Sequence, residues 1–273
     1  MPPRKPRPRP VSESPLLRQL RALRGGAERR RTGLFYAEGN RIVHQAALAG
    51  VQIEQLVIAP EVVTSDLARE TIDLLRSRGV PVAELSKVEF NRISFRGNPS
   101  GVGAVVRARP EALDGLRLEG GLGWVALAEV GNAGNLGAIL RTCAAVGAAG
   151  VIALGHTTDP YHPDAVKASM GALFHLRMVE ARFEDFVRWK SQVGAFVVGA
   201  AGEAAQDFRA VRYPAPLVLL MGSERLGLNA EQQAACDVLA SIPVLGGVVD
   251  SLNLSVATSL FLYEVFRQHT KQD

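Results

Sequence analysis

Three apolar segments in the second half of the chain share one pattern: residues 132–147, 217–228 and 241–255. Each reads as a strand, a tight glycine turn and a helix, with polar residues at the turn. Burying an amide or a guanidinium in small, apolar surroundings is costly unless the group has partners. We therefore expect the polar residues of these segments to have a task. The near-continuous apolar strands favour an α/β fold with a parallel sheet covered on both faces.

The composition divides the chain into four parts. Residues 1–13 contain five prolines and are predicted to be a disordered basic tail. Residues 14–108 alternate strand and helix patterns and are predicted to form a small α/β domain. Residues 109–122, rich in glycine and charge, are the best linker candidate, and 123–273 form the second α/β domain.

The alternation predicts the following elements. In the first domain, a helix begins after Ser14 and ends at Gly25, strands cover 34–37, 55–59, 81–85 and 101–107, and helices cover 41–49 and 65–77. In the second, strands cover 124–130, 151–154, 195–199, 217–221 and 239–244. Its helices cover 136–147, 165–172, 183–193, a short stretch near Ala230, and 254–268.

The charge is distributed unevenly. Residues 1–31 hold ten lysines and arginines against two glutamates, so this segment carries +8 and the rest of the chain −4. A localised basic arm favours a polyanionic partner, although a solubilising tail would have the same composition.

Other features restrict the function classes. No apolar run reaches transmembrane length, and the basic start is followed by no apolar stretch typical of a secretory signal. Two cysteines provide no disulfide framework, so we expect a reducing, cytoplasmic setting. His156, His162 and His175 lack metal-ligand spacing, and no metal is predicted.

The helices predicted at 136–146 and 254–266 are apolar nearly all round. A helix at the edge of a small domain should have a polar face, so these two should be buried on two sides. We therefore expect them to face a second protomer in a homodimer.

The three segments, taken in order, resemble the three motifs of the SpoU (TrmH-like) RNA ribose 2′-O-methyltransferases of the SPOUT class. The resemblance covers residues 124–268 strongly. It covers 14–108 more weakly, as that family's ribosomal-protein-like RNA-binding domain. It implies S-adenosyl-L-methionine as cofactor, methylation of a ribose 2′-hydroxyl, a homodimer and a C-terminal trefoil knot. Ribosomal RNA fits the added domain better than transfer RNA.

The resemblance also implies which residues are catalytic: Arg141, Asn135, Glu224, Ser251 and Asn253. In the family, the residue that matches Arg141 is central and is often proposed as general base. Arginine stays protonated, so a fork that clamps the target phosphate and polarises the 2′-oxygen is the easier role. Alternatively, Arg141 is a structural residue paired with Glu224 in the core. Ser251 could instead cap the last helix.

The cofactor pocket is expected at the turns of the second and third segments. Gly222, Ile242 and Leu252 match family positions that contact the cofactor, and Met221 adds an apolar wall. Gly222, with Gly246 and Gly247, would let the backbone approach a ligand closely. The alternative is that these glycines only serve turns.

The first domain contributes candidate RNA contacts. Arg31, Arg41, Arg92 and Arg96 are expected to bind phosphates, and Phe95 to stack on a base.

The first segment departs from the family, which usually places a proline before the Asn-x-Gly. Here Ala133-Gly134 precede Asn135, and the loop 243–251 is about one residue longer than usual.

Two other functions would fit parts of this sequence. A nicotinamide-binding reductase would explain Gly131, Gly134 and Gly137, but their spacing is not G-x-G-x-x-G. The strand after the helix also ends without an acid for a ribose hydroxyl. A catalytically inactive RNA-binding protein is disfavoured because every catalytic-type position is filled.

Overall fold

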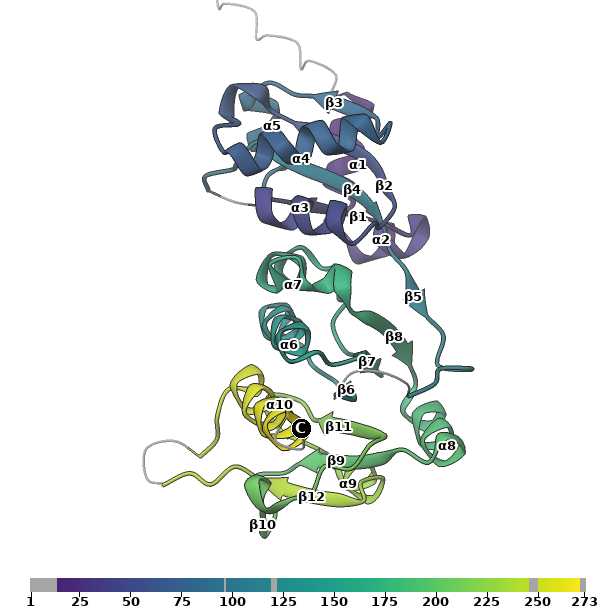
Figure 1. The fold of residues 1–273 in the computed structure, drawn as a ribbon. Coiled ribbons are helices and arrows are strands. Elements are labelled where there is room, and N and C mark those ends of the chain that lie inside the picture. The colour runs from purple at the N-terminus through teal and green to yellow at the C-terminus, as the bar shows by residue number, and fades with distance from the viewer. Residues whose placement is uncertain (1–13, 96, 119–121, 246–249, 271–273) are drawn as a thin grey trace, which may run out of the picture.

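The computed structural model describes residues 14–95, 97–118, 122–245 and 250–270. The predicted tail 1–13, Arg96, Gly246 and Gly247 lie outside the described residues. Two sheets, each with its own helices, lie one above the other (Figure 1). No helix in the described ranges is long and apolar enough to span a membrane.

The first sheet has the strand order β1-β4-β2-β3, with only β2 and β3 parallel. Its strands are β1 Leu34–Glu38, β2 Ile53–Ile58, β3 Val82–Glu84 and β4 Val102–Arg107. Its helices are α1 Pro15–Ala22, α2 Gly26–Thr32, α3 Asn40–Leu48, α4 Asp66–Ser77 and α5 Lys87–Ile93, with a 3₁₀ turn η1 at Pro60–Val62. Helices α1 and α5 cover one face, and α3 and α4 cover the other.

Two helices of this domain escaped the sequence prediction. Helix α2 begins directly after Gly25, which was expected only to end α1. Helix α5 begins with a capping box, in which the Ser86 hydroxyl and the Glu89 carboxylate each bond the other's backbone N–H. This Ser-x-x-Glu signal is visible in the sequence and could have located α5.

The second sheet contains eight strands, all parallel, in the order β10-β12-β9-β11-β6-β7-β8-β5, as the apolar strands predicted. The strands are β5 Pro110–Glu111, β6 Trp124–Ala128, β7 Gly150–Leu154, β8 Arg177–Ala181, β9 Phe196–Ala200, β10 Gln206–Asp207, β11 Leu217–Met221 and β12 Val238–Ser241. The helices are α6 Ala133–Val146, α7 Pro163–Ser169, α8 Phe183–Val193, α9 Ala230–Ala234 and α10 Leu254–Thr270, with 3₁₀ turns η2 Ala172–His175 and η3 Phe208–Ala210.

The two faces of this sheet carry different helices. Val125 and Leu127 of β6 pack in one core with residues of α6, α7 and α10. Trp124 and Ala126, which point the other way, pack in a second core with Phe186 of α8. Both faces of the sheet are therefore covered, which explains why its strands are apolar throughout.

The predicted linker contains a short strand of the second sheet. Pro110 and Glu111 form β5, which pairs with β8, another strand that was not predicted. The Glu111 carboxylate also accepts from Arg177 at 2.6 Å. Residues 110–111 thus belong to the second sheet, although they lie inside the range 109–122 that was expected to be the linker.

The two domains are joined by specific contacts. Buried Arg29 of α2 donates to Asp159 at 2.7 Å and to the Leu23 carbonyl oxygen at 2.8 Å. The Phe35 and Tyr161 ring centroids lie 4.7 Å apart. A buried arginine with several acceptors fixes the arrangement, because leaving any of these groups unpaired is costly.

Candidate active site

The polar residues of the three sequence segments meet at the carboxyl ends of β6 and β11. The Glu224 carboxylate, after β11, accepts from the backbone N–H groups of Gly131 and Asn132 at 3.1 and 3.0 Å. It also accepts from the Asn135 side-chain amide at 3.2 Å. Glu224 therefore holds the loop that leads into α6.

These bonds set the charge state of Glu224. Partial desolvation raises its pKa, but the backbone N–H groups and the Asn135 amide together outweigh that effect, so the pKa is lowered. The carboxylate stays ionised at neutral pH. Because it occupies the N–H groups of Gly131 and Asn132, they are not offered to a dinucleotide phosphate, which weakens the reductase alternative.

The third segment joins the same network. The Asn253 side-chain amide donates to the Asn135 side-chain oxygen at 3.1 Å. The Asn253 side-chain oxygen in turn accepts from the backbone N–H of Ser255, at the start of α10. Asn253, rather than Ser251, thus acts as the capping residue of α10. Three segments far apart in sequence are linked through Asn135.

A cavity of about 270 Å³ lies beside this network, at the carboxyl ends of β9, β11 and β12. Its lining includes all four residues predicted for the cofactor, Met221, Gly222, Ile242 and Leu252. Glu224 and Ser251 also line it. The cavity therefore combines apolar walls with a carboxylate and a hydroxyl, as sites for small ligands usually do.

The backbone around Gly222 leaves no room for a side chain at this position. A Cβ at this position would lie 2.1 Å from the carbonyl carbon of Gly227. Ser223 and Gly227 close the turn by exchanging two backbone hydrogen bonds of 3.1 Å. The space around Gly222 is therefore filled by the turn itself, which supports the alternative that this glycine serves a turn.

Arg141 lies in the middle of α6, six residues after Asn135 and about 9 Å further along the helix axis. Its side chain is exposed, and no hydrogen bond or ion pair joins it to Glu224 in the described part of the chain. The alternative of a core pair with Glu224 is therefore wrong. The guanidinium is exposed in the single chain, on a helix that was expected to face a second protomer.

The predicted RNA contacts lie on the first domain, away from the network. Arg41 and Arg92 are exposed, whereas Arg31 forms an ion pair with Glu28 at 2.6 Å. Phe95 was expected to stack on a base, but its ring already contacts Tyr36, 5.9 Å between centroids, and Arg24.

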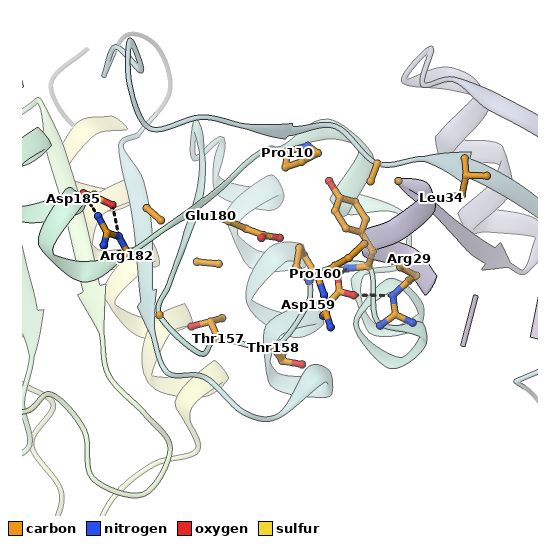
Figure 2. A pocket seen from close by; sticks show the side chains of 17 residues that line it. Arg29, Leu34, Pro110, Thr157, Thr158, Asp159, Pro160, Glu180, Arg182 and Asp185 are labelled. Carbon is orange, nitrogen blue, oxygen red and sulfur yellow. Dashed lines mark hydrogen bonds and ion pairs between the residues drawn. The ribbon is translucent and has the colours of Figure 1, made fainter. Parts of the chain in front are cut away.

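A second cavity was not predicted. It is a cleft of about 660 Å³ between α2 and the loops that follow β7 and β8 (Figure 2). Sequence reasoning also missed Arg29 and Asp159, which hold its two sides together. No local signal marks Arg29 within its basic run. The described residues contain no group of three or more His, Cys, Asp or Glu side chains suited to a metal ion.

The fold and the site define a two-domain α/β protein with a ligand cavity at the carboxyl edge of a parallel sheet. Residues 124–263, just over half of the chain, match the SpoU rRNA methylase family, and residues 14–104 match the MRM3-like substrate binding domain. The chain belongs to the SpoU rRNA methylase family.

Individual relatives are similar along nearly the whole chain. A 23S rRNA (uridine(2479)-2′-O)-methyltransferase of Streptomyces viridochromogenes is 30% identical over 94% of this chain and 91% of its own length. The AdoMet-bound crystal structure of an rRNA methyltransferase from Sinorhizobium meliloti is 36% identical, with a TM-score of 0.84 over 93% of this chain and 95% of that one. The structure of AviRb from S. viridochromogenes with AdoMet has a TM-score of 0.84 at 29% identity, over 94% of this chain and 99% of that one.

Proposed function

We propose that this protein is an S-adenosylmethionine-dependent methyltransferase that acts on a ribose 2′-hydroxyl of ribosomal RNA. The observation that carries the proposal is the network of Glu224, Asn135 and Asn253 beside a cavity lined by Met221 and Ile242. The names of the relatives support the reaction and favour ribosomal over transfer RNA.

The cavity fits such a cofactor. Ile242, Leu252 and Met221 offer apolar surface to an adenine ring, while Ser251 and the backbone near Gly222 offer polar groups. When bound, S-adenosylmethionine supplies an electrophilic methyl group. The residues of this chain then have to hold the ribose oxygen in line with that methyl. Glu224 and Asn253 act by fixing Asn135 and the loop before α6.

We assign Arg141 a role in binding the RNA substrate. Transfer of the methyl group that bound S-adenosylmethionine would supply requires the ribose 2′-hydroxyl to lose its proton. A protonated guanidinium cannot take that proton, but it can bind the adjacent phosphate through two N–H groups and stabilise the charge that develops on oxygen. Its exposure in the single chain is compatible with this role.

We also propose that the protein is a homodimer through α6 and α10. Helix α10 exposes four large apolar side chains at helical spacing, Val256, Leu260, Tyr263 and Phe266. Helix α6 lies against it, with Thr142 and Ser259 hydroxyls 2.9 Å apart. An exposed apolar stripe of this length is typical of an interface. Light scattering at micromolar concentration should give twice the chain mass, and a monomeric mass would contradict the proposal.

Three further expectations stay predictions. The chain should divide at the boundaries 1–13, 14–108, 109–122 and 123–273, although β5 now assigns residues 110–111 to the second sheet. The C-terminal segment should form a trefoil knot. The protein should act in the cytoplasm, without a metal and without a membrane partner.

The decisive experiment is methyl transfer. Wild-type protein and Arg141→Ala are incubated with labelled S-adenosylmethionine and with ribosomal or transfer RNA from cells that lack this gene, and 2′-O-methyl sites are mapped. We expect one new site in ribosomal RNA with the wild type only. Tight binding of NAD without methyl transfer to any RNA would refute the proposal.

A further inference from the structure

The interdomain cleft is large enough for a nucleotide and lies beside the candidate active site. Strands β11, β6, β7 and β8 are consecutive neighbours in the sheet. The active-site loops follow β11 and β6, and the cleft loops follow β7 and β8. Neighbouring strands are about 4.8 Å apart, so the first and last of these loops are separated by roughly 14 Å. The backbone N–H of Thr158 also donates to the Val130 carbonyl oxygen at 2.7 Å, tying the two regions together.

Most charged groups in the cleft already have partners. Asp159 accepts from Arg29 and from the Tyr161 backbone N–H, both at 2.7 Å. Arg182 pairs with Asp185 at 2.8 Å. These groups build the walls of the cleft.

Two other charged groups in the cleft differ from these in their contacts. The Glu180 carboxylate and the Arg30 guanidinium both line the cleft, yet neither forms a hydrogen bond or ion pair with the residues that the structure describes. Figure 2 shows Glu180 extending into the middle of the cleft. Desolvation by the walls raises the pKa of Glu180, the Asp159 carboxylate raises it further, and Arg30 opposes both. The Glu180 side chain is exposed, and a carboxylate that lines a cleft without a donor among the described residues is open to a ligand that brings N–H groups.

We propose that the cleft binds a guanine nucleotide of the RNA substrate close to the methylated ribose, with Glu180 accepting from the base and Arg30 contacting its phosphate. A carboxylate offers two parallel acceptors. Guanine offers two adjacent N–H donors on its Watson–Crick edge, at N1 and the exocyclic amino group, whereas adenine, cytosine and uracil each place an acceptor beside their donor. Leu34, Pro110 and Pro160 supply apolar surface for the ring. This inference rests on the proposed function, since it assumes an RNA substrate.

The test uses 5′-mononucleotides as minimal probes on the full chain, with S-adenosylhomocysteine present to occupy the other cavity. We expect GMP to bind about tenfold more tightly than IMP, which lacks only the exocyclic amino group, because one hydrogen bond to a charged acceptor is lost. AMP should bind more weakly still. Glu180→Gln should remove the preference for GMP over IMP. Glu184→Gln, an exposed glutamate of α8 outside the cleft lining, should retain it.

The outcomes separate the two proposals. If the wild type methylates RNA but binds GMP and IMP equally, or binds neither at millimolar concentration, the guanine site is wrong and the methyltransferase stands. The same holds if Glu180→Gln keeps the preference. If GMP is preferred through Glu180 but no RNA accepts a methyl group, the proposed function fails instead.

Discussion

The two cavities of this protein are built in different ways. The cavity of about 270 Å³ is lined by residues 200–261, and the network beside it has its polar side chains bonded to one another. The cleft of about 660 Å³ is lined by residues from Arg29 to Asp185, and Glu180 and Arg30 in it have no partner among the residues that the structure describes. The first is completed within one domain, whereas the second exists only where the two domains meet. A ligand of the second can therefore depend on how the domains dock, and a ligand of the first need not.

The largest expected effect concerns Arg141. Arg141→Ala should lower kcat about 10²- to 10⁴-fold, because a group that positions and polarises the reacting oxygen is lost. The affinity for S-adenosylmethionine should change little, since Arg141 does not line that cavity. Single-turnover methylation and calorimetry measure the two quantities.

Two variants sharpen this result. Arg141→Lys keeps the positive charge but loses the paired N–H groups of the guanidinium. If Arg141 binds the phosphate through those two groups, the lysine variant should recover little of the methylation activity. Near wild-type activity of the lysine variant, with an optimum at lower pH, would identify a proton acceptor instead. Arg212→Ala, at an exposed position with no assigned role, is the control.

The next effect is on stability. Arg29→Ala should lower the free energy of unfolding by about 2–4 kcal/mol, because the largely buried Asp159 carboxylate loses its partner. Arg31→Ala removes an exposed pair and should cost under about 1 kcal/mol. Denaturant unfolding measures both. If the cleft depends on the docking of the two domains, Arg29→Ala should also weaken GMP binding while S-adenosylmethionine still binds. Loss of both ligands would show that the two cavities do not respond independently to this substitution.

Gly222→Ala should weaken cofactor binding about ten- to 100-fold, because the new Cβ forces the turn at Gly227 to move. Gly202→Ala gives a comparison within the same cavity, since a Cβ there meets no atom of the described residues within 4 Å, and its effect should be much smaller. Equal effects from the two substitutions would mean that the turn is not rigid. Calorimetry with S-adenosylmethionine measures both affinities.

The smallest expected effect is a difference in the pH at which the binding of the two ligands weakens. The pKa of Glu224 is lowered, so its contribution to the active-site loop is complete above the ordinary glutamate pKa, about 4.3, and is lost only below it. The pKa of Glu180 is raised, so its carboxylate protonates at a higher pH. On acidification GMP binding should therefore weaken before cofactor binding does. Parallel titrations measure this, and the reverse order would contradict the assigned charge states.

The sequence placed the residues of the first cavity together because they lie in local strand–turn–helix segments, and the same apolar patterns predicted the parallel sheet. Gly222, Ile242 and Leu252 were singled out through the resemblance to the family motifs, and their contact with the cofactor stays a prediction. The cleft was not predictable, because Arg29 and Asp159 are 130 residues apart and neither stands out from its surroundings. The exposure of Arg141 in the single chain did not follow from the sequence, because the apolar pattern nearly all round its helix indicated burial on two sides, one of them against a second protomer.

Strand β5 covers the edge of β8, which could otherwise pair with another chain. An uncovered edge strand exposes a row of N–H and C=O groups that can pair with another chain. Here β8 is closed by only two residues, Pro110 and Glu111. The proline lacks an N–H and cannot extend the ladder, and the glutamate adds charge held by Arg177. A fragment that starts at residue 123 would lack this cover, and we expect it to aggregate through β8 even though it retains every residue of the first cavity.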